Sequence, residues 1–251
     1  MAKLSGKKAL ITGSSSGIGA GVARAFADEG ADVVINFPDP SEAANAEQVL
    51  ADIEKIGQQG WSVQADVSSE ADADRLVNSA LEAMGRIDIL VNNAGIAHAG
   101  TVEEIPVETW DRMMAVHLRS VFLVTRRVIT GMYEHNYGKI INTASQLAYK
   151  GAPGFTHYTA AKGAILSFTR SLALEVGDRE ISVNAVAPGA THTPILEGVP
   201  SSLLESIRQS IPKKRLAEVE DIVPSYVFLA SNESSHYQGQ CLSPNGGDVF
   251  L

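Results

Sequence analysis

Short apolar runs alternate with longer amphipathic stretches along the whole chain. Seven segments have the composition of buried strands: KKALIT, ADVVIN, WSVQAD, IDILVN, KIINTA, ISVNAV and GQCLS. Between them, apolar residues recur at helical spacing over 17–29, 41–57, 69–84, 107–135, 155–176 and 218–230. Apolar strands separated by helices indicate a parallel sheet that is covered on both faces. We therefore predict an α/β fold, a doubly wound seven-stranded parallel sheet formed by residues 1–251 as a single domain.

The stretch between residues 188 and 212 departs from this alternation. It reads PGATHTPILEGVPSSLLESIRQSIP, with four prolines and no strand pattern, and it follows the sixth predicted strand. Ligands of open α/β sheets lie beyond the carboxyl ends of the strands, and long connections there are commonly functional. We predict that residues 188–212 form a lid over a substrate. The alternative is a surface excursion that packs a short helix.

Composition and charge narrow the classes of partner. The 251 residues are 45% hydrophobic and 20% charged, as expected for one folded domain. Twenty basic and twenty-nine acidic residues give a net charge of −9, which argues against nucleic acid or an anionic membrane as a partner. Cys241 is the only cysteine, so an internal disulfide and a cysteine metal cluster are excluded. Because the N-terminal apolar run is too short for a signal or a membrane span, we expect a cytoplasmic protein. We also expect that its chemistry requires no metal.

The first predicted strand runs directly into a glycine-rich turn, TGSSSGIG at residues 12–19, which opens a helical pattern. Gly13 can make the tight turn, Gly17 lets main-chain amides approach a pyrophosphate, and Gly19 permits close helix–strand packing. The glycine spacing is GxxxGxG, whereas the dinucleotide fingerprint is GxGxxG. The turn therefore matches the mechanism of phosphate binding but not the spacing of the fingerprint. An ordinary loop is the alternative. We predict a phosphate-binding turn, whose other expected contacts are Ser14, Ser16 and Ile18.

A second pattern, YTAAK at residues 158–162, places a tyrosine and a lysine four residues apart, with Ser145 thirteen residues before the tyrosine. Residues four apart share a face of a helix, so Tyr158 and Lys162 can point toward one ligand. Taken alone, this spacing has little weight, because a packed tyrosine and a solvated lysine meet it by chance.

Six ordered signals together resemble the short-chain dehydrogenase/reductase family over essentially the whole chain, in the branch of 3-oxoacyl reductases and glucose dehydrogenases. They are TGSSSGIG at 12–19, ADV at 65–67, NNAG at 92–95, Ser145, YTAAK at 158–162 and PGATHTP at 188–194. The resemblance implies a Rossmann-type fold, NAD or NADP as the cofactor, and hydride transfer between a secondary alcohol and its ketone. It also assigns Ser145, Tyr158 and Lys162 to catalysis.

The chemistry of these three residues can be argued independently. Tyrosine has a pKa near ~10 in water and holds its proton too tightly to act as a base near neutrality. The ammonium of Lys162 and the positive charge of an oxidised nicotinamide would stabilise the phenolate of Tyr158. Ser145 can donate a hydrogen bond to the substrate oxygen, where negative charge develops. By the resemblance, Lys162 also bonds the nicotinamide ribose.

The resemblance extends to further nucleotide contacts. It assigns Asp66 and Val67 to the adenine ring, although by sequence alone Asp66 is more typical of a helix cap. It places the loop 92–95 over the cofactor, where a plain turn is the alternative. The remaining contacts that it implies are Asn92, Asn93, Ala94 and Gly95 in this loop, and Pro188, Gly189, Thr191 and Thr193 near the nicotinamide.

One departure from the family concerns the helix after NNAG. The family places an asparagine in a pattern like WDxxxxVNL, where it supports a proton relay through water to the lysine, whereas this chain reads WDRMMAVHL with His117 at that position. Histidine can donate and accept through its ring nitrogens, and its ordinary pKa near ~6.5 would couple a relay to pH. Two interpretations of His117 remain at this point: a catalytic relay residue, and a helix histidine satisfied by local hydrogen bonds.

The choice between NAD and NADP depends on the end of the second predicted strand, ADVVINFPDP. An acidic residue there binds the 2′-hydroxyl of NAD, whereas a nearby arginine accommodates the 2′-phosphate of NADP. The chain has Asn36 and Phe37 instead, and Ser16 is neutral where NADP-preferring relatives often carry a basic residue. Since Ser14, Asn36 and Ser41 can hydrogen-bond a phosphate, the sequence is compatible with both nucleotides.

The resemblance also implies which residues lie near the catalytic group, and their chemistry indicates the substrate. Gln146, His98 and His157 offer donors and acceptors for a polyol, a sugar or another small hydroxy compound, whereas Phe155 and Ile195 would suit an apolar ketone. The mixture favours a small polar substrate, held by Ser145, Gln146, His98 and Tyr158. Surface positions are the alternative for both histidines.

Two other functions stay open at this point. A 3-oxoacyl-[acyl-carrier-protein] reductase would need a basic surface for its acidic partner, for which Arg119, Arg126 and Arg127 are candidates. A nucleotide-binding regulator without catalysis is the other, and the intact catalytic residues argue against it. The family commonly forms tetramers, and NGGDVFL at 245–251 resembles one of those contacts. We therefore expect a homotetramer whose other partner is a small-molecule alcohol or ketone.

Overall fold

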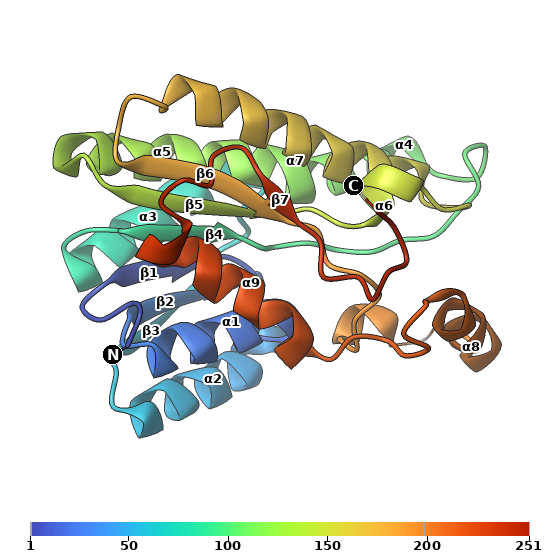
Figure 1. The fold of residues 1–251 in the computed structure, drawn as a ribbon, viewed down its shortest axis with the longest axis horizontal. Coiled ribbons are helices and arrows are strands. Elements are labelled where there is room, and N and C mark those ends of the chain that lie inside the picture. Colours follow the sequence, from blue (N-terminus) through green and yellow to red (C-terminus); the bar gives the residue numbers. More distant parts are fainter. Residues whose placement is uncertain (1, 198, 251) are drawn as a thin grey trace.

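A seven-stranded parallel sheet forms the centre of the computed structural model, which describes residues 2–197 and 199–250 (Figure 1). The strand order is β3-β2-β1-β4-β5-β6-β7, and each neighbouring pair is parallel. The strands are β1 (Lys8–Ile11), β2 (Asp32–Phe37), β3 (Gly60–Gln64), β4 (Ile89–Asn92), β5 (Gly138–Thr143), β6 (Ile181–Val186) and β7 (Cys241–Leu242). All seven overlap the runs predicted from the sequence, so the predicted doubly wound, Rossmann-type fold is confirmed. Residues 1, 198 and 251 of the predicted domain lie outside the described residues.

Helices cover both faces of the sheet (Figure 1). One face carries α1 (Gly17–Asp28), α2 (Ala43–Ile56) and α9 (Val219–Ala230), and the other carries α3 (Glu70–Met84), α5 (Ser120–His135) and α7 (Thr156–Glu175). Alternate residues of β1 enter opposite cores, because successive side chains of a strand point to opposite faces. Ile11 lies in the core with Phe26, and Leu10 lies in the core with Leu76. Burial on both faces explains why the strands read as nearly continuous apolar runs.

The strand order reverses between β1 and β4. β1 pairs with β2 on one side and with β4 on the other, so the connections that leave β1 and β4 diverge at the carboxyl edge of the sheet. Ligands of doubly wound sheets bind at such a point. The glycine-rich turn follows β1, NNAG follows β4, Ser145 follows β5, and the 188–194 segment follows β6. The fold therefore gathers the predicted motifs at one edge.

The helix predicted over 107–135 contains a turn of wider helix. The structure has α4 (Val107–Met114), a π-helical segment (Ala115–Arg119) and then α5. Single π-helical turns are rare in proteins as a whole, but those that occur often lie at functional sites. His117 lies at the centre of this turn. The other predicted helices begin and end within two residues of their expected bounds.

The 188–212 segment contains a short 3₁₀ turn (Pro194–Leu196) and α8 (Ser201–Ser210). Figure 1 shows α8 set apart from the layers around the sheet, and none of its residues is buried. A bridge joins Thr191, near the start of this segment, to Ala217, which lies just past its end. A segment with little burial opens at low cost, which suits the proposed lid. Gly198, within this segment, lies outside the described residues.

Candidate active site

Tyr158 and Lys162 lie one turn apart near the start of α7, as their spacing predicted. The Nζ atom of Lys162 is 5.7 Å from the centre of the Tyr158 ring and donates a hydrogen bond of 2.7 Å to the carbonyl oxygen of Thr143, at the end of β5. Lys162 is buried, and desolvation lowers its pKa to about 7. An additional partner for the ammonium, such as a ribose hydroxyl, would therefore favour its charged form.

Ser145 completes this group from the segment that follows β5. Its side chain is buried, and its hydroxyl accepts a hydrogen bond of 3.1 Å from the amide of Leu147. Burial raises the pKa of Tyr158, and the nearby Ser145 hydroxyl acts in the opposite direction. The fold thus brings Ser145, Tyr158 and Lys162 together, and in this state the tyrosine holds its proton.

His117 packs edge-on against Tyr158, with the ring centres 5.3 Å apart. Its Nε2 atom faces the backbone of Ile96, 2.8 Å from the carbonyl oxygen and 3.1 Å from the amide nitrogen. Gly95 leaves room for the ring, because a Cβ atom there would lie 2.7 Å from the histidine Cε1. His117 therefore links the π-helical turn to the backbone just after the NNAG loop. Its Nδ1 atom is buried and has no hydrogen-bond partner among the described residues.

The glycine-rich turn after β1 has the geometry of an anion cradle. Gly13 and Gly17 have φ values of 58° and 53°, in the left-handed region that glycine adopts readily. The first amides of α1 lack acceptors within the helix, and within the described chain the N-cap residue Ser16 provides no side-chain cap. Free amides at the start of a twelve-residue helix suit a phosphate.

Two other segments lie against this turn. Asn93 donates through Nδ2 to the carbonyl oxygens of Thr12 and Gly13, at 3.1 and 2.8 Å. A Cβ atom on Gly17 would lie 3.4 Å from the side chain of Thr193. The turn, the NNAG loop and the start of the 188–212 segment thus surround one region at the carboxyl edge of the sheet, and their geometry fits a dinucleotide.

Comparison with known proteins decides the family. Residues 13–248 match the family model described as enoyl-(acyl carrier protein) reductase. The chain is 37% identical to the 3-oxoacyl-[acyl-carrier-protein] reductase of Synechocystis sp., with all of both chains covered. This protein belongs to the short-chain dehydrogenase/reductase family. It is therefore an oxidoreductase that uses NAD or NADP and acts on CH–OH groups.

A further relative and a solved structure are similar to this dehydrogenase/reductase over almost all of its chain. It is 40% identical to the glucose and ribitol dehydrogenase of Daucus carota over 98% of this chain and 86% of the relative. A short-chain dehydrogenase from Burkholderia cenocepacia, solved in complex with NADP, superposes with a TM-score of 0.90 at 32% identity, over 98% of this chain and 99% of the other.

Two residues expected to contact the nucleotide in this dehydrogenase/reductase make hydrogen bonds within the protein. Asn36 is buried, and its Nδ2 lies 2.9 Å from the carbonyl oxygen of Ala65 while its Oδ1 accepts from the amide of Gly13 at 3.1 Å. Ser14 is also buried, and its hydroxyl donates to Ile11 and accepts from the amide of Asn36. Both side chains thus join the glycine-rich turn to β2 and β3, and a phosphate contact by Ser14 or Asn36 stays a prediction.

Asp66 and Asn92 are likewise engaged within the protein. Asp66 accepts from the amide and hydroxyl of Ser68 and forms an ion pair with Arg112 at 2.9 Å. Burial raises the pKa of Asp66, but these bonds outweigh it, so the pKa is lowered overall. Asn92 is buried and bridges β4 to β5 through Asn142 at 2.9 Å. An adenine contact by Asp66 and Val67 stays a prediction, as do the contacts predicted for Phe37, Ile18, Ala94, Pro188, Gly189 and Thr191.

The histidines proposed for the substrate lie together. Nδ1 of His98 and Nε2 of His157 are 3.3 Å apart, which joins the loop after β4 to the start of α7. His157 is fully buried, whereas His98 is exposed. A surface position is thus excluded for His157, and a direct substrate contact stays a prediction for His98.

Sequence reasoning missed two contributors to this site. Thr143 holds Lys162 through a backbone carbonyl, which carries no side-chain signature. Asp248 reaches Gln146 from 102 residues away, with an Nε2–Oδ2 distance of 2.8 Å. The signal that could have indicated Asp248 was the isolated acid in the otherwise uncharged NGGDVFL.

The substitution His117→Asn tests how the histidine acts. Burial, and then the charge of Lys162, lower the pKa of His117 well below its usual range, so the ring is neutral near pH 7. A depressed histidine pKa means that the unfolded chain takes up the proton first, so folded-state stability is lost as the pH falls below ~6.5. An asparagine amide can pair with both backbone groups of Ile96. In His117→Asn, we expect the acid limb of the pH–rate profile to move about half a pH unit or more toward lower pH. The acid limb of the curve of stability against pH should move in the same direction.

Full pH–rate profiles and pH-dependent unfolding curves measure this shift. The matched control is His135→Asn, an exposed histidine at the end of α5. If the acid limb of His117→Asn stays where it is in the unsubstituted protein, His117 is not the group that titrates.

Proposed function

We propose that this protein interconverts a small polar secondary alcohol, of the polyol or sugar class, and its ketone, with Tyr158 as the acid and base. The observation that carries the proposal is the convergence of Ser145, Tyr158 and Lys162 at the carboxyl edge of the sheet, the edge that also carries the glycine-rich turn. The polar groups nearby, Gln146 and His98, favour a hydroxylated substrate. The similarity to a glucose and ribitol dehydrogenase supports the same class.

In the proposed reaction, each residue of the site has a distinct role. The bound nucleotide supplies the hydride in reduction and accepts it in oxidation. Ser145 donates a hydrogen bond to the substrate oxygen and orients it, and Tyr158 transfers a proton to that oxygen in reduction. The raised pKa of Tyr158 keeps the proton available near neutrality. Lys162, held by Thr143, binds the nucleotide ribose and, when charged, stabilises the phenolate left behind.

The balance between the two nucleotides depends, in this proposal, on a carboxylate beside the glycine-rich turn. Glu42 accepts a hydrogen bond of 3.1 Å from the Ser15 hydroxyl. A negative charge at this edge would repel a 2′-phosphate more than a 2′-hydroxyl. We expect Glu42→Gln to raise kcat/KM with NADP relative to NAD by about two- to fivefold, the range of one partly solvated charge.

Steady-state kinetics with both nucleotides measure that ratio. Asp28→Asn is the matched control, since it removes an exposed carboxylate at the opposite end of α1. An unchanged ratio in Glu42→Gln would exclude Glu42 from nucleotide selection.

The alternative of a carrier-protein reductase finds less support. Arg126 pairs with Glu70 at 2.8 Å, and Arg127 pairs with Asp74 at 2.9 Å. Arginines engaged with acidic neighbours present a weaker positive surface to an acidic partner. The relationship to a 3-oxoacyl-[acyl-carrier-protein] reductase keeps this activity as the second candidate.

A homotetramer in the cytoplasm is the assembly and location that we propose. Phe250 and Leu174 are 88% and 85% exposed, which suits burial against another subunit. The single cysteine suits a reducing compartment. Among the described residues, no helix is both long and apolar enough to cross a membrane. Sedimentation equilibrium tests the assembly, with about four times the chain mass of 26.6 kDa expected.

A screen of ketones and alcohols with both nucleotides tests the proposed function. We expect oxidation of reduced nucleotide with small hydroxy ketones, read as loss of its absorbance. Turnover of 3-oxoacyl carrier-protein substrates alone would establish the second candidate. Tight nucleotide binding without turnover of any compound would indicate a regulator.

A further inference from the structure

Gln146 lies between the two segments that border the reacting group. It directly follows Ser145, so their Cα atoms are ~3.8 Å apart. The backbone amide of Gln146 donates a hydrogen bond of 3.0 Å to the carbonyl oxygen of Pro188, at the start of the 188–212 segment. Gln146 is buried, with only 4% of the residue exposed. The backbone of Gln146 therefore lies beside Ser145, the residue that orients the substrate oxygen in the proposed reaction.

A carboxylate determines which way the Gln146 amide faces. Nε2 of Gln146 lies 2.8 Å from Oδ2 of Asp248, and Nζ of Lys150 lies 2.6 Å from the same oxygen. An ionised carboxylate only accepts hydrogen bonds, so the NH₂ group of the amide must face it. The carbonyl atom Oε1 is thereby turned away from Asp248. It is buried and has no partner among the residues that the structure describes.

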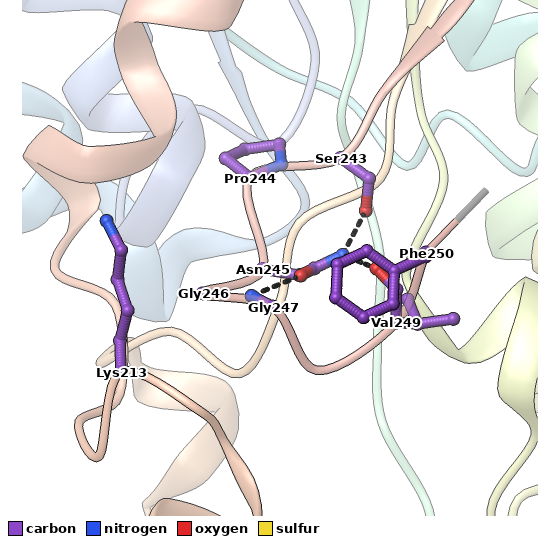
Figure 2. Close-up of a pocket in the computed structure, with 8 residues that line it drawn as sticks. All are labelled: Lys213, Ser243, Pro244, Asn245, Gly246, Gly247, Val249 and Phe250. Atoms are coloured by element: carbon purple, nitrogen blue, oxygen red, sulfur yellow. Dashed lines mark hydrogen bonds between the residues drawn. The ribbon is translucent and has the colours of Figure 1, made fainter.

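The segment that carries Asp248 is itself held in place. The side chain of Asn245 donates to the Ser243 hydroxyl and the Val249 carbonyl oxygen and accepts from the amide of Gly247, as Figure 2 shows. This turn lines a hollow of about 520 Å³ and contacts the 188–212 segment through Gly189. The Asp248 side chain is only 6% exposed. Its carboxylate is thus a fixed support rather than a solvated charge.

We propose that Asp248 is a positioning residue, which holds the Gln146 amide so that its Oε1 accepts a hydrogen bond from a second hydroxyl of the substrate, next to the reacting carbon. An unpaired buried acceptor is costly, and a substrate hydroxyl satisfies it while a methyl group does not. The site consequently selects α-hydroxy ketones and vicinal diols. This inference rests on the proposed function, since it names the substrate class of the same site.

The test compares 1-hydroxy-2-propanone with 2-butanone, in which a methyl group replaces the hydroxyl. We expect kcat/KM of the unsubstituted protein to favour the hydroxy ketone by about tenfold or more. In Asp248→Asn the asparagine can donate to Oε1 and turn the amide, so the preference falls about tenfold. Lys213→Gln, which removes one charge beside the same segment without touching Asp248, is the control and keeps the preference.

A positioning role predicts non-additivity. Gln146→Leu removes the preference, and adding Asp248→Asn to it changes the preference no further. If Asp248→Asn does not fold, the preference of the unsubstituted protein and its loss in Gln146→Leu decide the matter. Turnover of both ketones without a preference, or a preference that survives in Gln146→Leu, overturns the proposal and leaves the proposed function standing. Absence of turnover with any carbonyl compound overturns both.

Discussion

Replacing Tyr158 with phenylalanine is expected to lower kcat by about a thousandfold or more while nucleotide binding persists. Proton transfer by a positioned side chain contributes about 10²- to 10⁴-fold to the rate, and phenylalanine has no proton to transfer. The ring itself would remain packed, because its edge-on contacts with His117 and Phe155 do not need the hydroxyl. Turnover in both directions, together with titration of the nucleotide, separates the two effects.

The Tyr158 result has a matched control in Tyr237→Phe. Tyr237 is 38% exposed and packs on Phe228, far along the chain from the catalytic residues. We expect this variant to keep its rate. A Tyr158→Phe protein that retains a rate within about tenfold of normal would show that another group moves the proton.

Replacing Gly19 with alanine is expected to abolish nucleotide binding and to destabilise the fold. The new Cβ atom would lie 2.2 Å from the carbonyl oxygen of Gly13, 2.5 Å from Nδ2 of Asn93 and 2.9 Å from Cα of Ser14. Two of these neighbours are backbone, so the glycine-rich turn itself must shift. We expect nucleotide affinity to fall about a hundredfold or more and the free energy of unfolding to drop by about 1–3 kcal/mol. Fluorescence titration and denaturant unfolding measure the two quantities.

Gly131→Ala controls for the substitution itself. Apart from the backbone of its own helix, a Cβ atom at Gly131, inside α5, meets no atom of the described residues within 4 Å. Alanine is favoured over glycine in a helix, so we expect this variant to gain about 0.5–1 kcal/mol and to bind the nucleotide normally. Normal nucleotide affinity in Gly19→Ala would mean that the turn tolerates the shift and that the close packing inferred for Gly19 is wrong.

The sequence by itself determined the sheet, its parallel strands and the place of the main motifs. Strands buried on both faces leave continuous apolar runs, and helices leave apolar residues at their own spacing, so both are readable locally. The pairing of Tyr158 with Lys162 is also local, because four residues make about one helical turn. The same applies to Gly13 and Gly17, whose positive φ values serve a turn that the sequence already marked.

Only the tertiary structure decided which polar side chains face inward. Ser14 and Asn36 can hydrogen-bond a phosphate by residue type, and the structure shows that both are buried and join the glycine-rich turn to β2 and β3. The π-helical turn at His117 and the lowered pKa of that residue depend on Ile96, Lys162 and burial, none of which a helical pattern encodes. Asp248 meets Gln146 across 102 residues because the strand order brings the ends of β5 and β7 to one edge of the sheet. Contacts between distant segments leave no periodic mark in the chain, which is why the spacing of Tyr158 and Lys162 was readable from the sequence and the contact between Gln146 and Asp248 was not.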